Sequence, residues 1–234
     1  MTPDAPAGPE RSLARLCVSA CAESYSRLSL STPLANALIS ETPAGHLLVA
    51  FRGSQSFRDW QTDFDVRRIN LGFATVHHGF WDAAASVLDQ ILLLDQRAKR
   101  PPMMFTGHSL GAALAQVVAW RYARAGRAVH SVYTFGGPRV GDGRWARDYN
   151  QLLGSVTFRH VNQEDIVPRV PSWLAGWRHT RTEVFRPSLG ASWQFKFPLW
   201  KKIISNAVGT YADWQHKKVA QLSDHNIQQY LDAL

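Results

Sequence analysis

Hydrophobic residues recur every three or four positions in several stretches of the chain, which is the spacing of a helix that buries one face. This pattern is most regular over residues 78–97, where Pro101 and Pro102 then predict the helix end. A second, strongly apolar helix ends before Gly126. The pattern predicts helices over residues 10–25, 78–97, 112–125 and 145–153.

Shorter apolar runs bounded by turn residues predict strands. The predicted strands cover residues 34–40, 46–51, 103–106, 129–135, 156–161 and 180–185. The segment 41–45 between the first two has the Pro and Gly content of a hairpin turn, so these two strands should be antiparallel. The later strands alternate with helices. This order predicts an α/β fold with a mostly parallel central sheet and helices on both faces.

The length of 234 residues fits one domain, which we expect over residues 10–234. Residues 1–9 are rich in Pro and Ala and predict a loose N-terminal arm. From Pro198 onward the pattern favours an amphipathic helix with Leu199 and Ile203 on one side and lysines near its start. An ordinary core helix and a helix that touches lipid interfaces both fit this pattern.

The composition is that of a folded globular protein, with 45% hydrophobic and 19% charged residues. The formal net charge is +8, but no zinc-ligand spacing, phosphate loop or RNA-binding motif accompanies it. We therefore expect no nucleic-acid partner. The basic clusters indicate either a solvated face or attraction to anionic interfaces.

Cysteine usage and hydrophobic runs bear on where the protein acts. Cys17 and Cys21 lie four residues apart on one predicted helix, where a disulfide would be strained, so both should be free thiols. We find neither an apolar stretch of signal-peptide type nor a run long enough to cross a membrane. We expect a cytoplasmic location and no transmembrane segment.

The run Gly107-His108-Ser109-Leu110-Gly111 lies between a predicted strand and a predicted helix. A sharp turn there can lift the Ser109 hydroxyl above the sheet edge, with the glycines leaving room for the crowded backbone. The Leu110 amide opens the helix, where unpaired N–H groups can meet the negative oxygen of a tetrahedral intermediate. This context predicts Ser109 as a nucleophile.

A serine nucleophile needs a base and an acid that holds the base, in the chain order Ser, acid, His in α/β-hydrolases. The candidate acids are Asp142, Asp148, Glu164, Asp165, Asp213 and Asp224. Asp165 is favoured because it lies in the loop that leaves the predicted strand 156–161. For the base, His225 is favoured by chain order and position, while spacing alone leaves His179 open.

Several motifs occur in a fixed order between Ala50 and Leu231. They are Phe51-Arg52-Gly53-Ser54, Asp59-Trp60, His78-Gly79-Phe80, Thr106 to Gly111, Thr134 to Asp142, Asp165 to Arg169 and Asp224-His225. Together they resemble the class 3 lipases, also called fungal-type or Rhizomucor-like lipases. The resemblance implies an α/β-hydrolase fold with a short helical lid.

The resemblance also implies roles for individual residues. It assigns Ser109 as nucleophile, Asp165 as acid and His225 as base, which decides against His179. It places the oxyanion donors at Ser54 and Leu110. The same resemblance implies a lid over residues 55–60, with Phe57 and Trp60 as apolar anchors.

The expected activity is carboxylic ester hydrolysis through an acyl-enzyme, without cofactor or metal. A triacylglycerol lipase is favoured, acting on a lipid or ester substrate at a lipid–water interface. A phospholipase A1 or a feruloyl-type carboxylesterase on the same scaffold stays open, because substrate choice lies in lid and pocket. A non-catalytic lipid-binding protein is the distant alternative.

Overall fold

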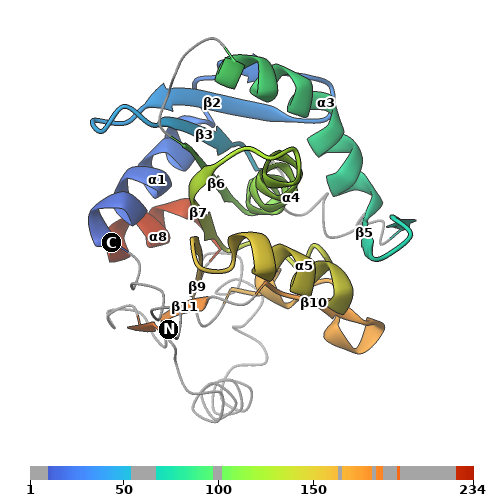
Figure 1. The fold of residues 1–234 in the computed structure, drawn as a ribbon. Coiled ribbons are helices and arrows are strands. Elements are labelled where there is room, and N and C mark those ends of the chain that lie inside the picture. Colours follow the sequence, from blue (N-terminus) through green and yellow to red (C-terminus); the bar gives the residue numbers. More distant parts are fainter. Residues whose placement is uncertain are drawn as a thin grey trace, which may run out of the picture.

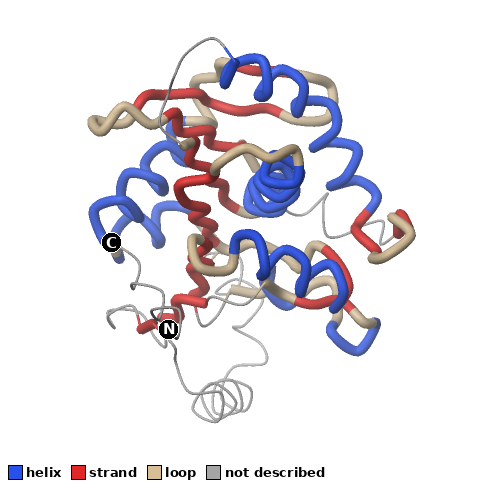
Figure 2. Tube along the Cα trace, viewed as in Figure 1, coloured by secondary structure: helices blue, strands red, loops and turns tan. Residues whose placement is uncertain are grey.

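The computed structural model describes residues 10–53, 67–96, 102–162, 165–180, 183–186, 194–195 and 225–234. Its main feature is an eight-stranded sheet that runs through the middle of the molecule (Figures 1 and 2). In spatial order its strands are β1 (Leu30–Ser31), β2 (Asn36–Glu41), β3 (Leu47–Phe51), β6 (Met103–His108), β7 (Val129–Phe135), β9 (Thr157–Asn162), β11 (Glu183–Arg186) and β12 (Gln194–Phe195).

The central strands of this sheet pair in parallel, whereas its outer strands pair antiparallel. Strands β3, β6, β7, β9 and β11 pair in parallel. The hairpin β2–β3 is antiparallel, as the turn chemistry of residues 41–45 predicts. The carboxyl ends of the parallel strands share one edge, where sheets of this kind place their functional loops.

Helices cover both faces of the sheet, as predicted (Figures 1 and 2). They are α1 (Arg11–Glu23), α3 (His78–Gln96), α4 (Leu110–Arg124), α5 (Gly143–Leu153) and α8 (Ile227–Ala233), with single 3-10 turns η1 (Val167–Arg169) and η2 (Trp173–Ala175). On one face α1 packs beside α8. On the other face α4 lies against β6 and β7 and is flanked by α3 and α5.

Each central strand divides its side chains between two hydrophobic cores. Leu48 and Ala50 of β3 face the core shared with α1 and α8, whereas Val49 and Phe51 face the core shared with α3, α4 and α5. This alternation follows from the two-residue period of a strand. A strand buried on both faces reads as a continuous apolar run, which is how β3 was recognisable in the sequence.

A second, antiparallel sheet was not predicted. It joins β10 (Trp177–Arg178), β8 (Gly141–Asp142), β5 (Thr75–His77) and β4 (Arg68–Asn70). Strands of two or three residues are too short to carry a periodic pattern, so the sequence gives no signal for them.

Both the N-terminal arm expected over residues 1–9 and the amphipathic helix expected from Pro198 lie outside the described residues. Among the residues that are described, none of the helices has the length and apolar character to span a bilayer.

Candidate active site

Ser109 occupies a strained turn between β6 and α4. Its backbone has φ 59° and ψ −127°, which makes it the one non-glycine residue with positive φ in the described part of the chain. Such a conformation costs roughly 1–3 kcal/mol and persists only where the surroundings hold it. Here the Ser109 N–H donates a 3.0 Å hydrogen bond to the carbonyl of Phe135 in β7.

The glycines on either side of Ser109 are required by close backbone contacts. A Cβ on Gly107 would lie 2.1 Å from the carbonyl oxygen of Gly111. A Cβ on Gly111 would lie 2.1 Å from the carbonyl oxygen of Phe51 in the neighbouring strand. Both distances are far below contact distance, so the turn cannot form with any larger residue. The close packing of the backbone therefore explains why the motif has glycine at both positions.

The N-terminus of α4 and the end of β3 meet beside Ser109. Leu110 is the first residue of α4, so its N–H has no acceptor within the helix. Gly53 passes so close that a Cβ there would lie 3.2 Å from Cβ of Ser109. Ser54, the other predicted oxyanion donor, lies outside the described residues, as do the predicted lid residues Phe57 and Trp60.

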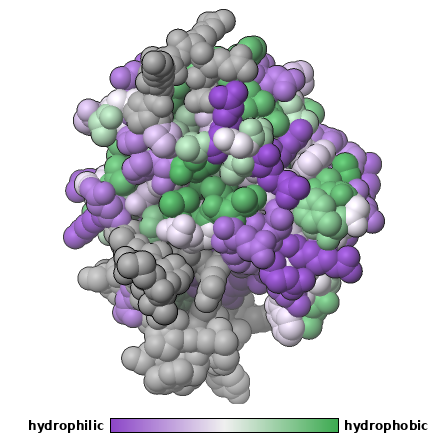
Figure 3. Space-filling model, viewed as in Figure 1, coloured by the Kyte–Doolittle hydropathy of each residue, from purple (hydrophilic) through white to green (hydrophobic). Residues whose placement is uncertain are grey.

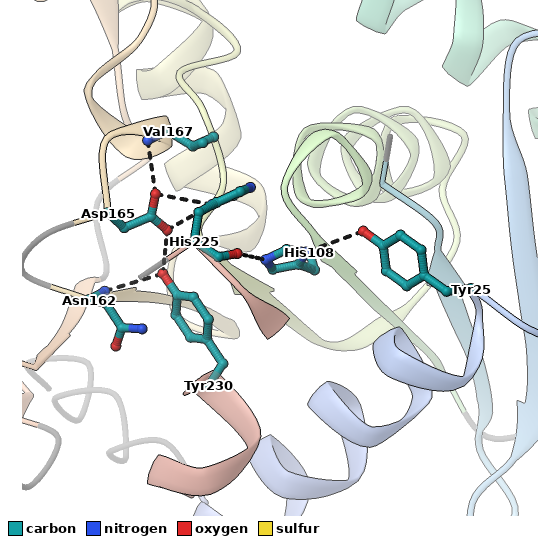
Figure 4. A network of polar contacts seen from close by, with 7 residues as sticks. All are labelled: Tyr25, His108, Asn162, Asp165, Val167, His225 and Tyr230. Carbon is teal, nitrogen blue, oxygen red and sulfur yellow. Dashed lines mark hydrogen bonds and ion pairs between the residues drawn. The ribbon is translucent and has the colours of Figure 1, made fainter. Parts of the chain in front are cut away.

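Asp165 is buried, with 1% of its surface exposed, and three donors converge on its carboxylate. The Val167 N–H donates to Oδ1 over 2.9 Å, and the Tyr230 hydroxyl donates to Oδ2 over 2.7 Å. Nδ1 of His225 lies 3.0 Å from both oxygens (Figure 4). This set of bonds compensates the burial of a charge.

The contact with Asp165 fixes the tautomer of His225. A carboxylate only accepts hydrogen bonds, so Nδ1 of His225 must carry a proton. In the neutral ring, the basic lone pair is then on Nε2. Figure 4 shows Nε2 on the side of the ring that points away from Asp165.

Two local contacts place His225 next to the serine turn. His108, directly before Ser109, stacks on the His225 ring with centroids 4.6 Å apart. Gly136, directly after the residue that accepts the Ser109 N–H, has φ 58°, and a Cβ there would lie 3.1 Å from Nδ1 of His225. The structure thus brings Ser109, Leu110, Asp165 and His225 to one edge of the sheet.

The rival candidates that the structure describes have other contacts. His179 lies 2.6 Å, through Nε2, from the carbonyl of Pro168. Asp142 caps α5 by accepting from the N–H groups of Arg144 and Trp145. Asp148 accepts from the indole of Trp120. Glu164, Asp213 and Asp224 lie outside the described residues.

Sequence reasoning missed Tyr230, Gly136 and Asn162. Tyr230 donates to Asp165 and accepts from the Asn162 N–H over 3.2 Å. Burial and the Asp165 charge raise the pKa of Tyr230 well above its usual range, so its hydroxyl stays protonated. Gly136 fell inside a motif that was used only for the family resemblance. A tyrosine on the helix that follows His225 carries no signal without the fold.

The described residues contain no group of three or more His, Cys, Asp or Glu side chains that could hold a metal ion. The polar groups at this edge of the sheet are a buried carboxylate, an imidazole and a hydroxyl on a strained turn.

A strand, a sharp turn carrying a serine and a helix, set in a mostly parallel sheet with helices on both faces, define the α/β-hydrolase fold. The family model described as lipase (class 3) matches residues 48–175, more than half of the chain. The chain belongs to the class 3 lipase family.

Over the matched segment, curated relatives are about one third identical to this chain. A secreted mono- and diacylglycerol lipase of Fusarium solani is 36% identical over 144 residues, covering 58% of this chain and 43% of the relative. A lipase of Rhizomucor miehei is 34% identical over 148 residues, covering 58% of this chain and 40% of the relative. The match thus spans less than half the length of these relatives.

Solved structures share the fold. The lipase from Rhizopus microsporus var. chinensis superposes with a TM-score of 0.68 at 24% identity, over 83% of this chain and 84% of that one. A triacylglycerol lipase whose catalytic centre is formed by a serine protease triad superposes with a TM-score of 0.67 at 23% identity, over 76% of this chain and 81% of that one.

The expectation of a cytoplasmic location is wrong. The relatives from Fusarium solani and Penicillium cyclopium are named as secreted lipases, which points to an extracellular location. The expectation rested on two free cysteines and on the lack of an apolar signal-like stretch in the printed sequence, and these observations are weaker than the naming of several relatives.

Proposed function

We propose that Ser109, Asp165 and His225 form a catalytic triad that hydrolyses carboxylic esters of acylglycerol type. The observation that carries the proposal is the pairing of Asp165 with Nδ1 of His225 at the edge where Ser109 is held in a strained turn. This pairing leaves the His225 lone pair on Nε2, which is the state that a general base requires.

In the first half of the reaction, Nε2 of His225 takes the Ser109 hydroxyl proton while Oγ forms a bond with the ester carbonyl carbon. The carbonyl oxygen becomes negative and accepts from the Leu110 N–H, with Ser54 as the second proposed donor. The carbon–alkoxy bond then breaks, and the leaving alcohol takes the proton from Nε2. An acyl-enzyme on Ser109 results.

In the second half, water replaces the alcohol. Nε2 of His225 takes a proton from water as the water oxygen attacks the acyl carbon, and it returns this proton to Oγ of Ser109 as the acid product leaves. Asp165 stabilises the imidazolium that forms in each half and keeps the ring in one orientation.

The proposed substrates are acylglycerols, because the relatives are named mono- and diacylglycerol lipases or lipases. A panel of monoacyl-, diacyl- and triacylglycerols beside a phospholipid and a feruloyl ester tests this choice. Faster turnover of the phospholipid or the feruloyl ester would contradict it.

The exposed loop formed by η2 (Trp173–Ala175) supports action at a lipid–water interface. Trp173 and Leu174 are 59% and 78% exposed, although their backbone is firmly held. Arg178 donates to the Trp173 carbonyl over 2.7 Å, and Arg68 donates to the Ala175 carbonyl. Figure 3 shows hydrophobic residues beside strongly hydrophilic ones at the lower right, the side on which the orange segment near β10 lies in Figure 1. Apolar side chains beside arginines suit contact with a lipid surface.

The triad is tested by Ser109→Ala, with Ser131→Ala of β7 as a matched control because Ser131 is another buried serine. Ser109→Ala should lower kcat for a soluble ester by a factor of about 10⁴ or more and abolish labelling by a fluorophosphonate probe. Ser131→Ala should retain both. Substantial turnover by Ser109→Ala would defeat the proposal.

The interface is tested separately by replacing Trp173 and Leu174 with serine. The double variant should lose activity on emulsified acylglycerol and keep activity on a soluble ester. Leu152→Ser on α5 is the control, since Leu152 is 45% exposed and lies outside the loop. Equal losses on both substrates would contradict the interface proposal and leave the triad proposal standing.

A further inference from the structure

His108, the residue before Ser109, is hydrogen-bonded to the backbone carbonyl of His225. Its Nε2 lies 2.7 Å from the His225 carbonyl oxygen, and the two rings stack at an interplanar angle of 26° (Figure 4). A carbonyl oxygen only accepts, so Nε2 of His108 carries the proton. His225 is therefore held at two points, by Asp165 at its ring and by His108 at its backbone.

The other ring nitrogen of His108 faces Tyr25, which follows α1. Nδ1 lies 3.3 Å from the Tyr25 hydroxyl. Burial lowers the pKa of His108 well below its usual range, and the neighbouring His225 acts in the same direction. The ring is thus neutral, Nδ1 is an acceptor, and the Tyr25 hydroxyl donates to it.

The Tyr25 hydroxyl also reaches the end of β3. It accepts a hydrogen bond from the backbone N–H of Gly53, and a Cβ on Gly53 would lie 2.5 Å from it. Burial raises the pKa of Tyr25 to about 12, so the hydroxyl keeps its proton for His108. A continuous series of hydrogen bonds therefore runs from Gly53 through Tyr25 and His108 to His225.

We propose that Tyr25 and His108 are positioning residues that hold the strand end before Ser54, the Ser109 turn and the backbone of His225 in one fixed arrangement. The proposal rests on the proposed function. Because His108 is covalently next to Ser109, the same residue sets the position of the nucleophile and that of the base. The hydrogen bond to Asp165 holds the ring of His225, and the hydrogen bond from His108 holds its backbone carbonyl.

The neutrality of His108 serves the same chemistry. An imidazolium forms on His225 in each half of the reaction, with the His108 ring stacked on it. A second positive charge at that distance would oppose its formation. A neutral donor at position 108 is required, and a glutamine side chain can supply one.

Three variants test the proposal: His108→Ala, His108→Gln and Tyr25→Phe. His108→Ala should lower kcat for a soluble ester about 10–100-fold, with KM within about twofold, because the base moves relative to Ser109. The rate of fluorophosphonate labelling should fall by the same factor. His108→Gln should recover most of the loss, since its amide can donate to the His225 carbonyl. Tyr25→Phe should lower both rates about 3–10-fold.

Tyr133→Phe is the matched control for Tyr25→Phe. Its hydroxyl accepts from the Glu10 N–H over 3.3 Å and lies next to α1, apart from the bonds around His108. This variant should lose thermal stability and label at the wild-type rate. A merely structural role of Tyr25 would make the two tyrosine variants behave alike.

The outcomes separate this proposal from the triad proposal. If the wild-type protein does not label at Ser109, the triad proposal fails. If it labels and folded His108→Ala labels equally fast, or if His108→Gln is no better than His108→Ala, the positioning proposal alone is overturned. Should His108→Ala not fold, Tyr25→Phe decides: an unchanged labelling rate overturns the proposal, and a loss that Tyr133→Phe lacks supports it.

Discussion

The hydroxyl of Tyr230 donates a 2.7 Å hydrogen bond to Oδ2 of Asp165, the same carboxylate that holds Nδ1 of His225. Tyr230 lies on α8, the short helix that directly follows His225. The C-terminal segment therefore supplies both the proposed base and a donor to the acid beside it. Asp165 in turn anchors this segment, because it accepts from two of its side chains.

Tyr230→Phe should remove this donor and leave the Asn162 N–H without its present acceptor. We expect a loss of about 1.5–3 kcal/mol in the free energy of unfolding, the usual range for a hydrogen bond to a charged group. The value of kcat should fall roughly tenfold because the carboxylate is held less firmly. Urea unfolding and steady-state kinetics on a soluble ester measure the two effects.

Tyr149→Phe is the control for this change. Tyr149 is also fully buried, and its hydroxyl bonds to Thr157 Oγ1 over 2.9 Å, away from Asp165. It should lose stability and keep kcat. A tenfold loss of kcat in both variants would mean that Tyr230 acts only through overall stability.

Much of the candidate site was predictable because its signals are local. Ser109 was predicted as a nucleophile from a five-residue run between a strand and a helix, and both elements lie close to where the pattern placed them. Asp165 was favoured by its position after a strand, which reflects the rule that loops at the carboxyl edge of a parallel sheet carry function.

The remaining parts depend on tertiary contacts. Spacing could not separate His179 from His225, because only the fold decides which ring meets Asp165. Tyr25 and His108 are 83 residues apart in the chain, and no periodic pattern links them. The second sheet, with strands of two or three residues, was missed for a similar reason: its strands are defined by their partners.

Gly136→Ala should damage the site directly. The residue has φ 58°, and a Cβ there would lie 2.5 Å from Oδ2 of Asp165 and 3.1 Å from the Tyr230 hydroxyl. We expect kcat to fall by about 100-fold or more, because the carboxylate must move away from His225. Kinetics on a soluble ester measure the loss.

Gly126→Ala separates this clash from backbone strain. Gly126 also has a positive φ, 76°, but a Cβ there would meet nothing within 4 Å. It should cost about 1–2 kcal/mol of stability for the left-handed conformation and leave kcat unchanged. If the two alanine variants lose activity equally, the contact with Asp165 is not the cause.

The two cysteines should be unreactive in the folded protein. Cys17 and Cys21 are free and buried between α1 and the sheet, and burial raises the pKa of Cys21 to about 12 and that of Cys17 well above its usual range. Reaction with a disulfide reagent at neutral pH should therefore proceed only as the protein unfolds. A time course with and without denaturant measures it.

Ser19→Cys provides the control for the reagent, since Ser19 is exposed on the same helix. The new thiol should react at once in the folded protein. Rapid reaction of the wild-type protein without denaturant would show that α1 opens easily and would contradict the prediction.

His160 should make the protein less stable in acid. It is buried in β9 against the rings of Phe135 and Tyr133, and burial lowers its pKa to about 3, although bonds to the backbone of Phe158 and Thr134 act the other way. The unfolded chain binds a proton as the pH falls below about 6.5, while the folded chain does not. The free energy of unfolding is therefore fully retained above that pH. Below it, the loss from this group approaches about 1.4 kcal/mol per pH unit.

Replacing His160 by glutamine should remove this contribution, so that urea unfolding shows a shallower fall in stability between about pH 6 and pH 4 than in the wild-type protein. The pH dependence of stability that remains in this variant includes a contribution from His108, whose pKa is also lowered by burial. Tyr149→Phe removes no histidine, so it should be less stable at every pH and keep the wild-type slope. An unchanged slope in His160→Gln would show that His160 is protonated in the folded protein as readily as in the unfolded chain, and that its burial between the aromatic rings does not exclude the charged form.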